Sequence, residues 1–249
     1  MKAFFRLFLL IFLAGLSLQL YFVGRIAMMA VVDPESTAFE RSAVYSVVTT
    51  TGSLKWRQQW VAYADISDNL KRAVIASEDA SFTEHEGVDI EALEKAWDKN
   101  AKAEQRVQQL GNKNTGAKTP AKPVKPAKIV GGSTITQQLA KNIFLSGERT
   151  LLRKGQELVL TLLLEKLLNK ERILEIYLNS VEWGEGVYGA EAASQFYYRK
   201  SASKLSAYEA ARLAVMLPRP KYFETRPNSG YLSSRASTIA ARMGGVELP

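Results

Sequence analysis

The sequence predicts a mainly α-helical protein that carries one membrane-spanning helix at its N-terminus. Two observations lead to this fold class. Residues 7–24 contain no charge and lie between Arg6 and Arg25. From residue 67 onwards, apolar side chains recur every three or four positions between capping residues and prolines, which is typical of amphipathic helices. The 249 residues include no cysteine, which excludes disulfides, thiolate catalysis and zinc–thiolate sites.

Residues 1–32 are predicted to form a short cytoplasmic tail and a transmembrane anchor. A helix rises 1.5 Å per residue, so the uncharged run nearly crosses a hydrocarbon core of ~30 Å, and apolar residues after Arg25 can extend it. A cleavable signal peptide is the alternative, because Lys2 and Arg6 resemble its charged start. The apolar run is longer than in most signal peptides and no small-residue cleavage site follows it. We therefore favour an uncleaved anchor, with the rest of the chain outside the cytoplasm.

Residues 33–66 are predicted to be a juxtamembrane segment that contacts the membrane. The segment mixes β-branched residues and aromatics, and Trp56 and Trp60 lie close to Lys55 and Arg57. This composition fits a partly buried hairpin or irregular cap. It fits equally an interfacial patch that rests on the bilayer. Both interpretations stay open.

The third region, residues 67–249, is predicted to be a helical domain. We expect helices at residues 67–82, 89–97, 134–144, 150–168, 171–181, 189–198 and 206–218. Residues 100–128 are rich in Lys, Pro, Ala and Gln and are predicted to form a flexible loop.

The positive charge of the chain is concentrated in this loop region. Residues 98–128 hold eight Lys or Arg against two acids, which accounts for six of the eight net positive charges. The segment has no aromatic residue to stack on a base and the rest of the chain is nearly neutral, so we expect no nucleic-acid partner. The charge can instead attract anionic lipid headgroups or cell-wall polymers.

The stretch "GGSTITQQLAKN", residues 131–142, combines a helix start with many hydrogen-bonding side chains. Thr134 and Gln137 match the capping-box pattern. Thr134, Gln138 and Lys141 then share one face, opposite an apolar face. A helix N-terminus and a lysine both favour an anion, although a merely solvated face has the same pattern.

Two further places carry candidate site residues. The helix at 150–168 is apolar nearly all round in its middle, so we expect it to be central and buried. Arg153 and Glu157 lie four residues apart on it, and a buried carboxylate needs such a partner, either in a structural pair or in a site. Glu78 ends the first helix, where a turn would expose it in a cleft. The only histidine, His85, follows closely, but a lone histidine is more often structural.

Five segments together resemble glycosyltransferase family 51, the peptidoglycan polymerases. They occur in the family's order over most of residues 67–223: "ASEDASFTEHEGVD", "GGSTITQQLAKNIFL", "RTLLRKGQE", "KERILEIYLNSVEWGEGVYGAEAAS" and "EAARLAVMLPRP". The resemblance implies a two-lobed, lysozyme-like α-helical glycosyltransferase domain with a cleft and a membrane-contacting small lobe. With a single anchor and no penicillin-binding domain after the motifs, the sequence is most similar to the family's monofunctional biosynthetic transglycosylases. The Lys/Pro-rich segment is longer than is usual between the first two motifs.

The resemblance also implies the reaction and the residues that perform it. The C4 hydroxyl of one lipid II attacks C1 of the growing chain and expels undecaprenyl pyrophosphate with inversion. This chemistry needs a carboxylate base and a cationic cradle. The motifs assign the base to Glu78 and leave Glu157 as a catalytic acid or an organiser of the basic residues. Pocket-shaping roles fall to Asp79, Phe82 and His85, and binding of substrate and pyrophosphate falls to Ser133, Thr134, Gln138, Lys141, Asn142, Arg149 and Arg153.

The resemblance further implies partners and a location. The partners are lipid II, the growing glycan strand, the membrane and other cell-wall synthesis proteins. The location is the bacterial cytoplasmic (inner) membrane, with the catalytic domain on the outer, periplasmic side. No cofactor is obligatory; a divalent cation, Mg or Mn, at the pyrophosphate stays open, with unknown ligands. A lysozyme-like hydrolase and a non-enzymatic scaffold are the alternatives: the former would not need Lys141 and Arg153, and the latter would tolerate loss of Glu78.

Overall fold

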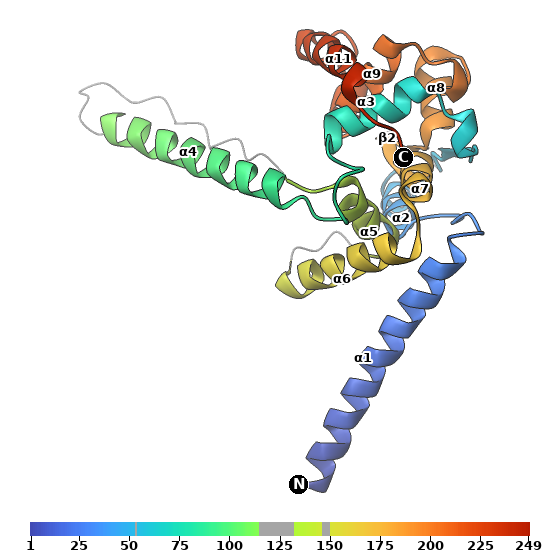
Figure 1. Cartoon of the computed structure of the whole chain (residues 1–249), viewed down its shortest axis with the longest axis vertical. Helices are drawn as coiled ribbons and strands as arrows, with labels where there is room; N and C mark the ends of the chain where they lie inside the picture. The colour runs from blue at the N-terminus through green and yellow to red at the C-terminus, as the bar shows by residue number, and fades with distance from the viewer. Residues whose placement is uncertain (53, 115–131, 146–149) are drawn as a thin grey trace.

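A computed structural model describes residues 1–52, 54–114, 132–145 and 150–249 of the chain. The described residues are mainly helical with one small sheet, which confirms the predicted fold class (Figure 1). The long helix α1 (Lys2–Met28) projects from the rest of the chain, with the N-terminus at its far end. Among the described residues, α1 is the one helix long and apolar enough to span a membrane, which is compatible with an anchor.

The end of α1 is fixed to the domain by side chains from two other helices. Gln19 donates a hydrogen bond to Gln156 on α6 (Leu151–Leu167), over a distance of 3.0 Å. Just beyond α1, the guanidinium of Arg172 donates to the carbonyl of Met29 (2.8 Å) and forms an ion pair with Asp33 (2.7 Å). These contacts join α1 and the residues just after it to α6 and α7 (Lys170–Ser180).

The juxtamembrane segment is helical where a hairpin was one of the two expectations. Helix α2 (Ala38–Thr51) begins with a capping box in which Thr37 and Glu40 satisfy each other's backbone N–H groups. The hairpin interpretation is therefore wrong for these residues: the capping box and packing of α2 against α5 (Ile135–Phe144) outweigh the strand propensity of the β-branched residues. Trp56 packs against Tyr188, with ring centroids 5.7 Å apart, in a partly buried irregular stretch.

Three short strands form the only sheet in the described part of the chain. They are β1 (Arg57–Gln58), β2 (Glu182–Gly184) and β3 (Val187–Tyr188), in the order β1-β3-β2. β1 runs parallel to β3, and β2 runs antiparallel to it. Gly186 makes the turn between β2 and β3 at φ +72°, and a Cβ there would lie 2.3 Å from the carbonyl oxygen of Lys55. The glycine-rich "EWGEGVYG" segment thus fastens the juxtamembrane stretch to the domain.

The remaining helices pack in two groups. One group consists of α3 (Asp68–Glu78), α9 (Ala207–Met216) and α11 (Gly230–Arg242); the other consists of α5, α6 (Leu151–Leu167) and α7 (Lys170–Ser180). Helices α8 (Ala190–Tyr198) and α10 (Pro220–Glu224), with the 3₁₀ turns η1 (Tyr63–Asp65), η2 (Ala202–Lys204) and η3 (Met243–Gly245), complete the domain. Helix α4 (Ile90–Asn114) extends away from both groups (Figure 1).

The long helix α4 corrects the prediction of a flexible loop at residues 100–128. The helix continues through residues 100–114, where the loop was expected to begin. Alanine, lysine, glutamine, glutamate and arginine dominate this stretch and are all strong helix formers, whereas the prolines begin only at Pro120. The average composition of residues 100–128 therefore predicts a loop, although their first half favours a helix and only their second half is rich in proline. Residues 115–128 lie outside the described residues.

Helix α6 is buried on one side only, so the prediction that it is central and buried is wrong. Glu157, Leu160 and Leu164 face the core, while Leu151 and Leu152 are 93% and 86% exposed. Leu158, Val159 and Leu162 are also exposed. Helix α6 also contacts α1, through the hydrogen bond between Gln156 and Gln19.

Candidate active site

A cleft of about 500 Å³ lies where the end of α3 and α11 face the start of α4 and the segment before α5. Its walls come from the end of α3, the first turns of α4, the segment before α5, and α11. Four predicted site residues line it: Glu78, Asp79, Ser133 and Thr134. The motifs that are far apart in sequence therefore meet at one cavity.

Glu78 is the last residue of α3 and one of its carboxylate oxygens accepts a hydrogen bond from the Gln138 amide (3.2 Å). The other oxygen accepts from the Ser77 hydroxyl (3.3 Å). Burial raises the pKa of Glu78 above its ordinary value, and the hydrogen bonds from Gln138 and Ser77 offset part of that rise. A carboxylate whose pKa is raised toward neutrality, facing a cleft, is suited to accept a proton from a substrate.

The orientation of Gln138 is set by a fully buried tyrosine. The hydroxyl of Tyr177 on α7 donates to the amide oxygen of Gln138 (3.0 Å), which leaves the amide NH₂ to point at Glu78. Burial raises the pKa of Tyr177 well above its ordinary value, so its hydroxyl stays a donor across the physiological range. Sequence patterns did not identify Tyr177, because it lies on the buried apolar side of α7, where a tyrosine is expected as a core residue.

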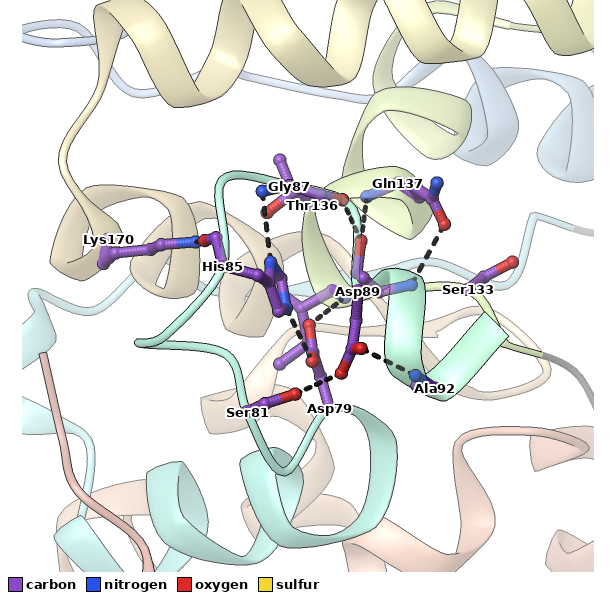
Figure 2. Close-up of polar contacts among 12 residues, drawn as sticks. Asp79, Ser81, His85, Gly87, Asp89, Ala92, Ser133, Thr136, Gln137 and Lys170 are labelled. Carbon is purple, nitrogen blue, oxygen red and sulfur yellow. Dashed lines mark hydrogen bonds and ion pairs between the residues drawn. The ribbon is translucent and has the colours of Figure 1, made fainter. Parts of the chain in front are cut away.

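Asp79 and His85 tie the turn after α3 to the start of α5 (Figure 2). The backbone N–H of Gly87 donates to Nδ1 of His85 (3.1 Å), so this nitrogen carries no proton. Nε2 must then hold the proton and donate it to Asp79 (2.9 Å), which assigns the neutral tautomer from the bonding pattern. The second oxygen of Asp79 accepts from the backbone N–H of Ile135 (2.9 Å). The carboxylate therefore stabilises the N-terminus of α5.

The loop between Asp79 and α4 is held by close packing under the cleft. Gly87 has φ +86°, and a Cβ there would lie 2.7 Å from a methyl carbon of Thr161. The hydroxyl of Thr134 donates to the carbonyl of Gly87 (2.7 Å). Phe82 is fully buried, with the ammonium of Lys170 4.6 Å from its ring centroid. Phe82 and His85 thus support the cleft from behind and do not line it.

Asp79, His85 and Asp89 bring three potential metal ligands within 4.8 Å of one another. Each is already engaged by the protein: Asp79 and His85 as described above, and Asp89 through the backbone N–H of Ala92 (2.7 Å) and the hydroxyl of Ser81 (Figure 2). The pKa of Asp89 is lowered, first by the Ala92 bond and then by Ser81. These groups fit a hydrogen-bonded structural cluster better than a metal site, because a cation would have to displace their donors.

A second cluster lies on α5 and α6. Arg153 pairs with one oxygen of buried Glu157 (3.0 Å), which confirms the predicted pair, and Lys154 contacts the other oxygen. Within the described ranges, Nε of Arg153 is buried and has no hydrogen-bond partner. Lys141 stays exposed, yet desolvation by the surrounding protein lowers the pKa of its ammonium, and the charge of Glu157 offsets part of this effect. The three cations outnumber the single acid, so the cluster attracts anions.

This basic cluster neighbours the cleft but does not line it. Gln138 connects the two regions, since it bonds Glu78 and lies on the same helix as Lys141. Asn142 is half-buried beside Lys141 on α5 and also lies outside the cleft wall. Arg149, a predicted binding residue, lies outside the described residues.

Four basic residues that were not predicted as site residues line the cleft: Lys95 and Lys99 from α4, and Arg235 and Arg242 from α11. The charge of Arg235 lowers the pKa of Glu78 slightly. Their spacings of four and seven residues place each pair on one helix face, which is a detectable signal. The sequence analysis did not use this spacing, because it predicts no helix at residues 230–242 and ends the helix of Lys95 at residue 97.

Comparison with known proteins gives consistent matches. The family model described as transglycosylase matches residues 46–111 and 117–244. A protein of Burkholderia thailandensis named "Biosynthetic peptidoglycan transglycosylase" is 53% identical over 236 residues, covering 95% of this chain and 84% of the relative. Proteins with the same name from Burkholderia pseudomallei (52% identity; 95% and 84% covered) and Paraburkholderia phytofirmans (50% identity; 95% and 90% covered) are similarly close.

Proposed function

The chain belongs to the transglycosylase family, and on that premise we propose that it polymerises lipid II into peptidoglycan strands with Glu78 as the general base. The observation that carries this assignment is Glu78 itself. It is a partly buried carboxylate at a cleft, its pKa is raised, and its orientation is fixed through Gln138 by Tyr177.

Glu78 is placed to take one proton in the reaction. The C4 hydroxyl of the acceptor sugar gives its proton to Glu78 as its oxygen forms a bond to C1 of the growing chain. The bond from C1 to the pyrophosphate oxygen breaks on the opposite side, which inverts C1 and releases the lipid pyrophosphate. General-base assistance of this kind contributes about 10²–10⁴-fold.

The basic cluster on α5 and α6 is suited to the leaving pyrophosphate. Lys141 and Arg153 supply positive charge, and a guanidinium binds phosphate oxygens through several N–H donors. Glu157 contacts both Arg153 and Lys154, so we assign it the role of organiser of the cations and not of acid. A divalent cation, Mg or Mn, would add positive charge there. Removal of metal with a chelator, followed by its re-addition, tests whether activity needs the cation.

Ser133 and Thr134 contribute differently to substrate binding. The hydroxyl of Thr134 donates to Gly87 and accepts from the Gln137 N–H, so its role is to build the start of α5. Ser133 is exposed at the cleft and its hydroxyl can reach substrate. The N-terminus of α5 adds a partial positive charge at the same place.

The membrane supplies the lipid substrate in this proposal. Helix α1 anchors the chain, and the exposed leucines on the outer face of α6 rest on the bilayer beside it. In this proposal the domain lies on the outer, periplasmic side of the inner membrane.

Incubation of the detergent-solubilised chain with labelled lipid II tests the proposal. We expect long glycan strands and release of undecaprenyl pyrophosphate. Cleavage of added peptidoglycan into short products, without strand formation, would identify a hydrolase instead. Absence of both activities in folded protein would favour a scaffold.

A further inference from the structure

The extended helix α4 carries a row of basic side chains along one face. The row consists of four exposed residues at spacings of four, three and four positions: Lys95, Lys99, Lys102 and Arg106. This spacing keeps them on one side of a helix. Over residues 95–106 the row is ~16 Å long at 1.5 Å per residue.

The row begins inside the cleft and leads out of it. Lys95 and Lys99 form part of the cleft wall, and Lys102 and Arg106 continue the same face beyond it. Across the cleft, Arg235 and Arg242 are also basic. The cleft therefore has basic side chains on two walls, beside the carboxylates of Glu84, Asp89 and Glu91, and the row marks an exit from it along α4.

Acidic side chains compensate this charge only in part. Glu91 forms an ion pair with Lys95 (2.5 Å), and Asp98 lies at the edge of the row. The opposite face of α4 exposes Ile90, Leu93 and Trp97, which are 59%, 49% and 76% exposed. The helix thus has an apolar face and a basic face, and the basic face is the one that continues the cleft wall.

We propose that this basic row binds the acidic peptides carried by the growing glycan strand as the strand leaves the cleft. The inference rests on the proposed polymerase function and names a second feature of its substrate. Every disaccharide of peptidoglycan bears a peptide with free carboxylates, so a growing strand is a polyanion that passes this exit. The row is complementary to it in charge and begins where the new bond forms.

A membrane surface fits this face less well. A bilayer would take the apolar face of α4, with its exposed tryptophan, and that face lies on the other side of the helix from the basic row. Anionic lipid is therefore the competing partner that the experiment must separate.

The experiment compares two substrates in neutral detergent: lipid II with its acidic peptide, and lipid II whose peptide carboxylates are amidated. The test variant is Lys102→Gln/Arg106→Gln, which keeps good helix formers. The matched control is Lys166→Gln/Lys204→Gln, which removes the same charge from exposed positions on α6 and η2. Strand length and initial rate are measured at low and high salt.

We expect the wild type and the control to use acidic lipid II better, by about threefold to tenfold, and this preference to fade as salt rises. The test variant should lose the preference while still polymerising the amidated substrate at the wild-type rate. A test variant that keeps the preference, or a wild type without one, overturns the inference. Binding of the wild type and the variants to anionic vesicles is measured in parallel, and a test variant that loses only this binding while keeping the preference also overturns the inference. A wild type that polymerises neither substrate refutes the proposed function itself.

Discussion

The hydroxyl of Tyr177 holds the amide of Gln138 in the one orientation that lets it donate to Glu78. The distance from the tyrosine oxygen to the amide oxygen is 3.0 Å, and the amide nitrogen lies 3.2 Å from the carboxylate. A residue on α7 thereby sets the environment of a carboxylate at the end of α3, although Tyr177 does not line the cleft.

Tyr177→Phe should lower activity and shift its pH dependence. Without the hydroxyl, Gln138 can rotate and its bond to Glu78, which lowers the pKa of that carboxyl, weakens. The pKa of Glu78 then rises, so the acidic limb of the rate profile moves to higher pH. We expect a rate loss of about fivefold to thirtyfold at neutral pH, equivalent to ~1–2 kcal/mol.

Tyr197→Phe is the matched control for this change. Tyr197 donates to the backbone carbonyl of Trp183 (2.9 Å), away from the cleft. Its loss should reduce stability without moving the acidic limb. If neither variant shifts the acidic limb of the pH–rate profile, Tyr177 has only a structural role.

Arg153→Ala should reduce both activity and stability. It leaves buried Glu157 with Lys154 alone and removes a cation from the pyrophosphate cradle, at a cost of about 1–3 kcal/mol in the free energy of unfolding. Lys154→Ala removes a more exposed partner and should cost less stability. Lys141→Ala should weaken use of lipid II with little change in melting. Thermal melting and steady-state kinetics on all three variants test this ranking of stability losses. An Arg153→Ala protein that melts like the wild type would contradict the ranking.

Glu40→Gln should stabilise the protein at high pH. Glu40 is fully buried, and burial raises its pKa from 4.5 to about 7. At a pH below the pKa of this carboxyl in the unfolded state, the folded and unfolded states both bind the proton, and the carboxyl does not change the stability with pH. As pH rises to about 7 the unfolded state ionises first, so the wild type loses stability over that range. Glutamine keeps the capping box with Thr37 and carries no charge.

We therefore expect the variant to unfold at a free energy about 1–3 kcal/mol higher than the wild type at pH 8, with no difference at pH 4. Denaturant unfolding at the two pH values measures this. If the variant and the wild type differ equally in free energy of unfolding at pH 4 and at pH 8, burial of the Glu40 charge is not the cause of the difference.

Local patterns in the sequence predicted local structure well. The capping box of Thr134 and Gln137 and the pair of Arg153 and Glu157 each lie within four residues, and both are confirmed. The contacts of Tyr177 with Gln138 and of Asp79 with Ile135 join residues 39 and 56 positions apart. No periodicity encodes such contacts, so the packing of the helices was needed to find them.

The predicted end of α4 and the predicted burial of α6 both rested on composition, and both were wrong. For α4, an average over a mixed segment hid a helix-forming half, and for α6, apolar residues on all sides were taken to mean burial in protein. An apolar surface beside an anchor helix has a second environment available, the membrane, which composition alone does not separate from a core.

The rate of glycan-strand formation from labelled lipid II by Glu78→Gln tests the central claim most directly. The amide is nearly isosteric and cannot accept the proton, so the rate should fall by about 10²–10⁴-fold while the melting temperature is retained. Glu84→Gln, at an exposed position on the same cleft, should retain the wild-type rate. A folded Glu78→Gln protein that polymerises lipid II at close to the wild-type rate would show that Glu78 is not the base.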